Sequence, residues 1–365
     1  MASANDTAGM PAAGPGLGGL ASVRGHAVAK AQLARALERG QLHHALLLVG
    51  PRGVGKATTA RAIAAALHCS VARGRGCGRC SACQRIAANL HAGVEWVAPE
   101  APGGKIKVEL ARELAARLQL APFEGDAHVV VFDPAEALTE QATNALLKTL
   151  EEPRPGVHFL LIAQALDGIL PTILSRCAIV RFGRLDDDEV AATLGDALVA
   201  TPPPEPVPPS RQALAVRMAD GSAGVAITLA LDASLDAIHD LVRAAAAAAS
   251  AGEAEIFGGD ATPLGQAWSA ATAGPTTGKP ARERAAAQRL AELWLLDLRE
   301  RIRGRAGLPE LPAAAEDRAG LLRVTESLFA MQQRLDRNAN AKLSLEQALL
   351  EIGATQRRSR ADARA

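Results

Sequence analysis

Residues 45–68, ALLLVGPRGVGKATTARAIAAALH, decide the fold of this chain. The apolar run 45–49 predicts a buried strand, and the pattern over 57–67 predicts a helix. The turn between them carries four residues of a phosphate-binding loop: Gly50, Gly53, Gly55 and Lys56. Glycines let backbone N–H groups approach phosphate oxygens, and the following helix adds the positive end of its dipole. A strand, a glycine-rich turn with a terminal lysine, and a helix together predict a nucleotide-binding fold.

One position next to this loop departs from the pattern of nucleotide-hydrolysing proteins. The residue after the loop lysine should carry the hydroxyl that binds Mg²⁺, but here it is Ala57, and Thr58 follows one place later. A shift of one residue turns a helical side chain by about 100°, so we expect Thr58 to be poorly aimed at the metal. The loop therefore predicts a nucleotide-binding fold that has lost hydrolysis.

A second departure lies at Asp133, which follows the apolar run 128–132. In hydrolysing proteins with such loops, an aspartate at a strand end binds Mg²⁺ and an adjacent glutamate polarises water. Here Pro134 follows the aspartate, and if a helix starts here, Glu136, three residues on, points away from that position. Asp133 itself fits an Mg²⁺ ligand and a turn or capping residue equally well.

Further apolar runs alternate with helical patterns in the first half of the chain. Four of them predict strands, at 94–97, 128–132, 158–163 and 178–182. Amphipathic patterns predict helices at 23–40, 108–120, 139–150, 186–200, 210–232, 281–303, 315–335 and 343–352. Buried strands that alternate with helices predict an α/β fold with a parallel sheet covered on both faces.

Composition divides the chain into an α/β part and a helical part. We predict a disordered tail at 1–19, a P-loop domain at 20–183, helical domains at 184–240 and 241–356, and a basic tail at 357–365. The proline-rich run 202–209 predicts an extended linker or loop. The stretch 258–280, rich in Gly, Thr and Ala, predicts a mobile segment.

Charge and hydropathy limit the classes of function. The chain has 365 residues, of which 40 are basic and 39 acidic, so its formal net charge of +1 provides no global field for DNA or a membrane surface. No apolar run is long enough to span a membrane, and the start lacks the basic and apolar regions of a signal peptide. We therefore expect a cytoplasmic protein without a membrane partner.

Four of the five cysteines lie close together in the sequence, at Cys69, Cys77, Cys80 and Cys83. Two-residue gaps allow four thiolates to converge on Zn²⁺. Four protein ligands leave no position for water, so we expect a structural zinc module at 69–83. The alternatives are free or disulfide-bonded cysteines, which a cytoplasmic chain disfavours, and an iron–sulfur cluster. The fifth, Cys177, is predicted to be a small buried residue.

The tripeptide Ser175-Arg176-Cys177 precedes the last predicted strand of the sheet. An arginine at this place can be a surface residue in a salt bridge, which is the usual fate of such a side chain. It can also be an arginine finger, which stabilises transition-state charge on a nucleotide held by a neighbouring subunit. The residues alone do not choose between these two roles.

The run NALLKTLEEP at 144–153 carries a family resemblance. This run, the zinc-type cysteines after the P-loop helix and the Ser-Arg-Cys tripeptide resemble those of bacterial clamp-loader AAA+ subunits. The resemblance covers residues 43–182, and the helical remainder fits the lid (184–240) and collar (241–356) domains of that family in order. It implies an AAA+ P-loop domain with a parallel sheet, a small helical lid and an all-helical collar.

Four positions resemble the delta-prime type of subunit in the DNA polymerase III clamp loader rather than its motor subunit, gamma/tau. They are Ala57 after the loop lysine, Asp133-Pro134 at the strand end, Ala163-Gln164-Ala165 at sensor 1, and Gly224 where the motor would carry the sensor-2 arginine. The resemblance implies a stator that does not hydrolyse ATP. It also implies that Arg176 is the finger donated in trans to the adjacent motor subunit.

The same resemblance implies the partners of the chain. They would be gamma/tau and delta subunits in a hetero-pentamer, which loads the sliding clamp onto primer–template DNA within the DNA polymerase III holoenzyme. The complete glycine pattern is compatible with ATP binding without turnover, in a degenerate site that includes Thr58 and Asp133. Two alternatives stay open: a gamma/tau-like motor ATPase in which Thr58 supplies the missing hydroxyl, and an unrelated zinc-stabilised P-loop adaptor.

Overall fold

The computed structural model describes residues 19–101, 103–120, 124–274, 278–304 and 318–362. The tail predicted at 1–19 lies outside them except for Gly19, and so do the first three residues of the helix predicted at 315–335. The chain divides into two compact units, one formed by residues 1–206 with 219–227 and the other by 207–218 with 228–365. The lid predicted at 184–240 contributes to both units, and the domain boundaries stay a prediction.

The first unit is built on a five-stranded parallel sheet, as the apolar runs predict. Its strands are β1 (Ala45–Val49), β2 (Val94–Val97), β3 (His128–Phe132), β4 (Val157–Ala163) and β5 (Ala178–Arg181). The spatial order is β2-β3-β4-β1-β5, so the strand that leads into the P-loop lies between β4 and β5. Every residue of β1 is buried, because the strand has a neighbour on each side and helices over each face.

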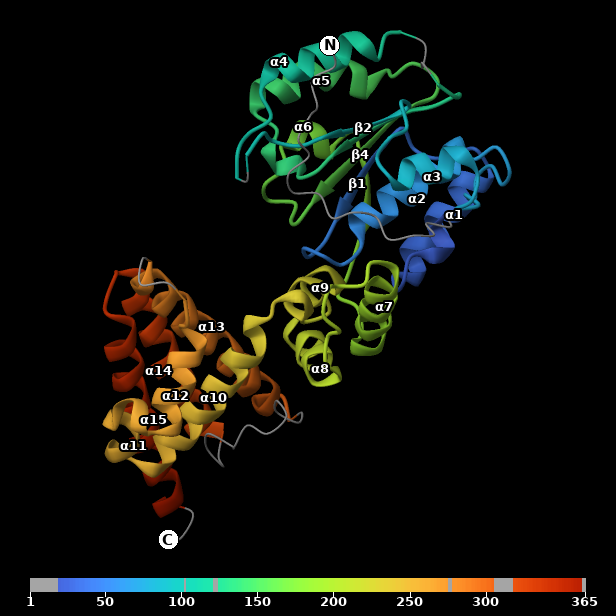
Figure 1. The fold of residues 1–365 in the computed structure, drawn as a ribbon. Helices are drawn as coiled ribbons and strands as arrows, with labels where there is room; N and C mark the ends of the chain where they lie inside the picture. Colours follow the sequence, from blue (N-terminus) through green and yellow to red (C-terminus); the bar gives the residue numbers. More distant parts are fainter. Residues whose placement is uncertain (1–18, 102, 121–123, 275–277, 305–317, 363–365) are drawn as a thin grey trace. The chain divides into compact units, whose positions relative to one another are not determined.

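Helices cover the sheet on both faces (Figure 1). One face carries η1 (Leu20–Ser22), α1 (Ala27–Glu38), α2 (Lys56–His68) and α3 (Ser81–Ala87), and the other carries α4 (Val108–Arg117), η2 (Ala135–Ala137), α5 (Glu140–Glu151) and α6 (Pro171–Leu174). Alternation along the strands divides the core accordingly. Leu46 and Leu48 pack with the α2 side, whereas Leu47 and Val49 pack with the α5 side. The predicted doubly covered α/β fold is therefore confirmed.

Three helices come next in the chain after the last strand of the sheet. Helix α7 (Asp187–Ala200) begins with a capping box in which the Asp186 side chain and Glu189 satisfy each other's backbone N–H groups. The Arg24 guanidinium forms an ion pair with Asp196 on this helix. The proline-rich run 202–208 contains no helix or strand, as predicted, and α8 (Pro209–Met218) and α9 (Ala223–Leu231) come after it.

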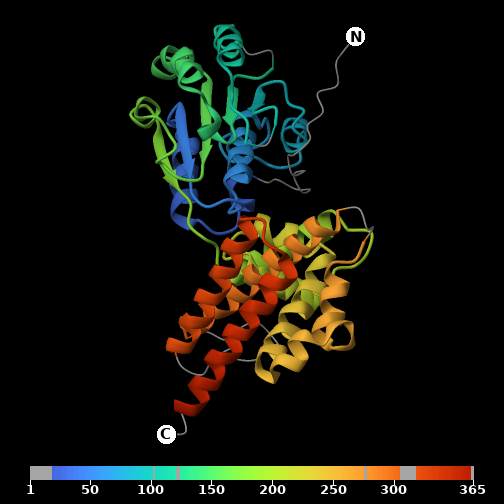
Figure 2. The ribbon, with the colours of Figure 1, turned by 90° about the vertical axis from the view of Figure 1, so that its left-hand side faces the viewer.

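The second unit is helical throughout its described residues (Figure 2). Besides α8, it contains α10 (Ser234–Ala251), α11 (Glu253–Phe257), η3 (Gly259–Ala261), α12 (Pro263–Ala271), α13 (Lys279–Ile302), α14 (Arg318–Asp336) and α15 (Ala341–Asp362). Helices α13, α14 and α15 lie side by side around fully buried Trp294, Leu328 and Ile352. Helix α15 extends beyond its predicted end at residue 352 and includes residues 357–362 of the predicted basic tail.

The prediction of a mobile segment at 258–280 is wrong for most of that stretch. Helix α12 occupies its centre, with Thr262 as an N-cap whose side chain accepts a hydrogen bond from the Gly265 N–H group. Leu264 and Trp268 are buried and hold the helix against α10. The Gly and Thr content gave no indication of this short helix. Burial of Leu264 and Trp268, four residues apart, outweighs the weak helix propensity of the residues around them.

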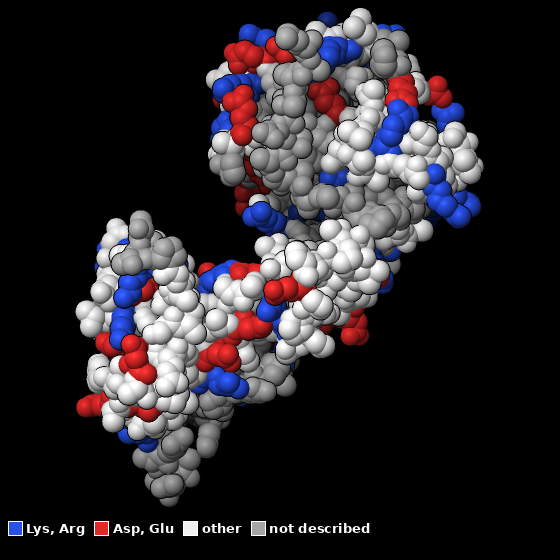
Figure 3. All heavy atoms as spheres, viewed as in Figure 1, with Lys and Arg blue, Asp and Glu red and all other residues white. Residues whose placement is uncertain are grey.

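Charged side chains of both signs are interspersed on the face of the molecule in Figure 3, in keeping with the small net charge. Among the described helices, none combines the length and the apolar character that crossing a bilayer requires.

We expect Trp268→Ala to release α12. Removing a buried aromatic side chain from a packed core costs about 3–5 kcal/mol, so the amides of residues 263–271 should lose protection in hydrogen-exchange mass spectrometry. Gln266→Ala is the matched control, because Gln266 is exposed on the same helix and should leave exchange almost unchanged. Fast exchange of these amides in the unaltered chain would contradict the packing of α12.

Candidate functional site: a P-loop, a cysteine cluster and an arginine pocket

The four clustered cysteines converge in space as predicted. Cys69 follows α2, whereas Cys80 and Cys83 lie at the start of α3, and the four sulfur atoms all lie within 4.8 Å of one another. The Sγ atoms of Cys69 and Cys80 are 3.8 Å apart. Four thiolates at about 2.3 Å from a tetrahedral Zn²⁺ would lie about 3.8 Å from each other, so the cluster could hold a metal ion of this size.

Backbone groups stabilise negative charge on these sulfurs. The N–H groups of Ala72 and Cys77 donate to Cys69 Sγ at 3.1 and 3.3 Å. A hydrogen bond from the backbone of Cys83 lowers the pKa of the Cys80 thiol to about 6, while burial raises that of Cys83 to about 12. Cys177 lies apart from the cluster, half-buried, and burial raises the pKa of its thiol to about 12.

The P-loop connects β1 to α2 in the predicted position. Gly53 and Gly55 have left-handed backbone conformations, with φ of 73° and 105°, which favour glycine. Lys56 begins α2 and is only 6% exposed, and its ammonium group donates to the carbonyl oxygens of Gly50 and Pro51 at 2.6 Å each. Burial lowers the pKa of this lysine, and the charge of Asp133 partly opposes the shift.

The positions beside the loop lysine offer no hydroxyl to a metal ion there. Ala57 follows it, Thr58 is exposed on α2, and the hydroxyl of Thr59 donates to the carbonyl of Gly55 at 2.9 Å. Asp133 is half-buried at the end of β3. Burial raises the pKa of its carboxyl group, and the positive charges of Lys56 and Arg61 oppose this. The charges of Lys56 and Asp133 therefore act on each other's pKa.

No α-helix starts at Glu136, so the condition under which its side chain was expected to point away from Asp133 is not met. The chain forms a 3₁₀ turn, η2, and Glu136 Oε1 accepts a hydrogen bond of 2.6 Å from the backbone N–H of Gln164, the residue after β4. Its Oε2 is buried and has no hydrogen-bond partner among the described residues. The charge of Glu136 acts on both Lys56 and Asp133. A helix would have turned this side chain outward, whereas the tighter turn brings it to the sheet edge.

Residues 222–224 contact the P-loop directly. The Ser222 hydroxyl donates to the carbonyl of Arg52 at 2.8 Å, and the Gly224 N–H donates to the carbonyl of Gly53 at 2.9 Å. A Cβ atom on Gly224 would lie 3.0 Å from the Cα atom of Gly53, which is a tight contact that requires the loop to shift. In this arrangement the position predicted to lack a sensor-2 arginine packs closely against the P-loop backbone.

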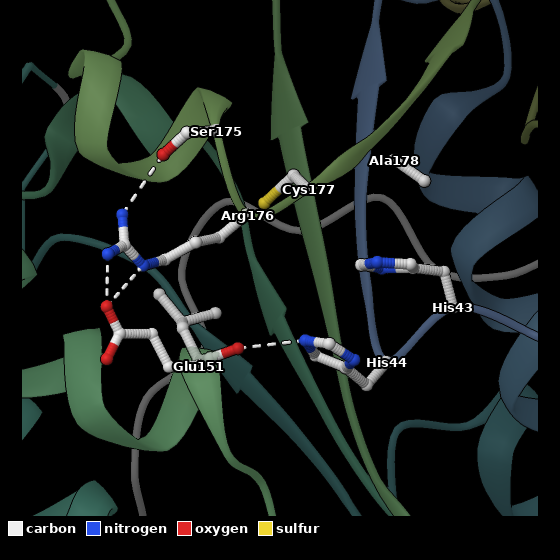
Figure 4. Close-up of a pocket in the computed structure, with 8 residues that line it drawn as sticks. His43, His44, Glu151, Ser175, Arg176, Cys177 and Ala178 are labelled. Atoms are coloured by element: carbon white, nitrogen blue, oxygen red, sulfur yellow. Dashed lines mark hydrogen bonds and ion pairs between the residues drawn. The ribbon is translucent and has the colours of Figure 1, made fainter.

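Arg176 lies in a surface pocket at the opposite edge of the sheet, where β1 and β5 begin (Figure 4). The pocket has a volume of about 310 Å³ and is lined by His43, His44, Leu150, Glu151, Ser175, Arg176, Cys177 and Ala178. The guanidinium of Arg176 forms an ion pair with Glu151, with Nε 2.8 Å from Oε1, and Nη1 donates to the carbonyl of Thr172 at 2.9 Å. Its side chain keeps 30% of its surface exposed.

The sequence did not predict the contacts that His26 and Ser222 make with the P-loop, or the contact of Glu151 with Arg176. His26 precedes α1 and its Nε2 lies 2.8 Å from the carbonyl oxygen of Val54 in the loop. Ser222 drew no attention, and Glu151 was noted only as part of the run 144–153. Each contact joins segments that are distant in sequence, and a single sequence carries no signal for such pairs.

We expect Gly224→Ala to destabilise the first unit by about 1–3 kcal/mol, because its methyl group would crowd the Cα atom of Gly53 and overpack this contact. Gly195→Ala is the matched control, since Gly195 lies within α7 and a Cβ atom there meets nothing within 4 Å. That control should stabilise the helix by about 0.5–1 kcal/mol. Urea unfolding should give changes of opposite sign in the free energy of unfolding of the two variants. Equal changes would contradict the contact between Gly53 and Gly224.

The P-loop half of the chain is similar to subunits of DNA polymerase III. Residues 25–186 match the family described as "DNA polymerase III, delta subunit". The chain is 35% identical over 158 residues to DNA polymerase III subunit tau of Escherichia coli K12, which covers 43% of this chain and 24% of that protein. It is 33% identical over 159 residues to subunit gamma of Buchnera aphidicola subsp. Acyrthosiphon pisum, which covers 43% of each chain.

A gamma subunit-related protein of Thermotoga maritima aligns with 89% of this chain and 99% of its own, at a TM-score of 0.42 and 15% identity. In the sequence comparisons above, the chain spans about a quarter of the length of the tau protein and under half of the length of the gamma protein. With its P-loop, parallel sheet and matched sequence, the segment 25–186 is similar to these subunits of DNA polymerase III.

Proposed function

We propose that this chain is a non-hydrolysing stator subunit of the DNA polymerase III clamp-loader complex. The observation that carries this proposal is the surroundings of Lys56. Ala57 replaces the hydroxyl residue that would bind Mg²⁺, and Thr58, the next hydroxyl, is exposed on α2. An intact loop without that ligand favours nucleotide binding over hydrolysis. ATP would then be a bound ligand of the degenerate site and not a substrate.

In the proposed complex, the chain assembles in the cytoplasm with gamma/tau and delta subunits into a hetero-pentamer. The pentamer loads the sliding clamp onto primer–template DNA, within the DNA polymerase III holoenzyme. Since the chain carries a formal net charge of only +1, the assembled complex and not this subunit alone would hold the phosphates of the duplex.

Arg176 is the residue proposed to act on the neighbouring motor subunit. The parallel pairing of β1 with β5 places Arg176 at the edge where these strands begin, whereas the P-loop follows the other end of β1. The five residues of β1 separate the two edges by about 16 Å. This separation supports a finger that serves a nucleotide on another subunit and not the loop of its own chain.

An active motor, similar to gamma/tau, is the second candidate. Two observations favour it: the matched relatives are tau and gamma subunits, and Glu136 brings a carboxylate to the edge where a water-polarising group would act. The purified chain distinguishes the candidates. A stator should not turn over ATP alone, whereas turnover that Glu136→Gln abolishes would support the motor.

We expect Arg176→Ala to reduce the DNA- and clamp-stimulated ATPase of the reconstituted complex. Loss of an arginine finger slows the site that it serves by about 10³-fold or more, so the complex should lose a large part of its turnover. Arg112→Ala removes an exposed arginine of α4 and is the matched control. Both variants must assemble into the complex to the same extent. Unchanged turnover with Arg176→Ala would show that Arg176 is a surface residue without a role in catalysis.

We propose that the metal of the cysteine cluster is structural zinc. Elemental analysis of the purified chain should find about one zinc per chain. Cys80→Ser should lose the metal and lower the melting temperature of the first unit, because a closed four-thiolate site contributes folding energy. Cys177→Ser, outside the cluster, should retain the metal. A chain without zinc, or with a different metal, would refute this assignment.

A further inference from the structure

The guanidinium group of Arg176 forms four hydrogen bonds within its own chain. Nε and Nη2 both donate to Oε1 of Glu151, with the Nε bond at 2.8 Å. Nη1 donates to the carbonyl of Thr172 at 2.9 Å and to the hydroxyl of Ser175 at 3.0 Å. Each nitrogen of the group therefore has a partner in this subunit (Figure 4). An arginine that stabilises a neighbour's phosphate must exchange some of these partners for phosphate oxygens.

Fixed parts of the fold bring the two members of this ion pair together. Glu151 is the last residue of α5, and the preceding residue, Leu150, is tied to the start of β1 because its carbonyl oxygen lies 2.8 Å from His44 Nε2. His43 stacks on His44, with ring centroids 4.4 Å apart. Arg176 lies between α6 and β5, which lies beside β1. The pair thus follows from how the ends of these elements meet.

Glu151 is the acidic residue among the described residues that line this pocket. Of the two imidazoles, His44 has its pKa lowered by burial and by the adjacent His43, which favours its neutral form. The carboxylate of Glu151 is therefore the charge that opposes an anion approaching Arg176. Removing it would make the pocket more positive without touching the arginine.

The ion pair is partly solvated, with 30% of the Arg176 side chain and 47% of the Glu151 side chain exposed. Ion pairs of this exposure are weak and are screened by salt. A nucleoside triphosphate carries several negative charges and accepts bidentate hydrogen bonds from arginine. It can therefore replace the single carboxylate of Glu151 as the partner of Arg176. A buried ion pair would be harder to separate.

We propose that Glu151 is a positioning residue that holds Arg176 within its own subunit until the phosphate of a neighbouring nucleotide displaces it. This inference rests on the proposed function of Arg176 as a finger. Glu151 competes with phosphate in the ground state and in the transition state alike. It thereby raises the ATP concentration that the adjacent site needs, with little effect on the maximal rate.

The test in the complex is Glu151→Gln, which keeps the shape of the side chain and removes its charge. The KM for ATP of the reconstituted complex should fall about two- to fivefold at low salt, the range expected for a partly exposed ion pair. The kcat should change little, and the difference in KM should shrink at high salt. Glu152→Gln is the matched control, since Glu152 is the next residue and is exposed. An unchanged KM would overturn the proposal.

The test in the isolated chain does not depend on the partners. Phenylglyoxal modifies accessible guanidinium groups, and peptide mass spectrometry measures its rate at Arg176. Glu151→Gln should raise that rate about two- to fivefold, and Glu152→Gln should leave it unchanged. Equal rates in all three proteins would show that the ion pair does not form, and would overturn the inference whatever the ATPase does.

Arg176→Ala separates failure of this inference from failure of the proposed function. In that background Glu151→Gln should have no effect on KM, because the residue acts only through Arg176. If Arg176→Ala lowers turnover while Glu151→Gln changes no KM, the finger stands and the counter-ion role is wrong. If Arg176→Ala leaves turnover unchanged, Arg176 is not an arginine finger, and the proposed role of Glu151 is wrong as well.

Discussion

The burial of β1 is the constraint on which the first unit depends. All five residues of this strand are buried and apolar, and its backbone groups are paired with β4 on one side and β5 on the other. A buried strand must have such partners, because unpaired backbone groups are costly away from water. The parallel pairing then fixes both ends of the strand. The P-loop follows one end, close to Asp133 and Gln164, while the pocket of Arg176 lies at the other.

The parts of this fold that the sequence predicts are those governed by local pattern. The strands β1, β2 and β3 have the predicted bounds, since a strand buried on both faces is a continuous apolar run between polar or glycine-rich segments. The convergence of the cysteines follows in the same way from short spacing. The order of the strands, in contrast, depends on contacts between distant segments, and no local pattern in β1 indicates that β4 and β5 are its neighbours.

The errors have physical causes of the same kind. Glu136 was expected to point away from Asp133 if a helix started there, but the chain makes a single 3₁₀ turn that brings its carboxylate to the residue after β4. At 258–280 the glycines and threonines suggested mobility, while burial of Trp268 stabilises α12. In each case a tertiary contact outweighs the local preference.

The glycines of the P-loop have a packing role that is separate from phosphate binding. A Cβ atom on Gly53 would lie 2.3 Å from the hydroxyl oxygen of Ser222, so this position needs glycine even if no nucleotide binds. Gly55 differs, because a Cβ atom there meets nothing within 4 Å and only its left-handed backbone favours glycine. Lys56 forms hydrogen bonds to two carbonyl groups of its own loop. A subunit that never hydrolyses ATP would therefore still need Gly53 to keep residues 222–224 in place. This packing role is one reason why a loop glycine can persist in a chain that lacks the Mg²⁺ ligand.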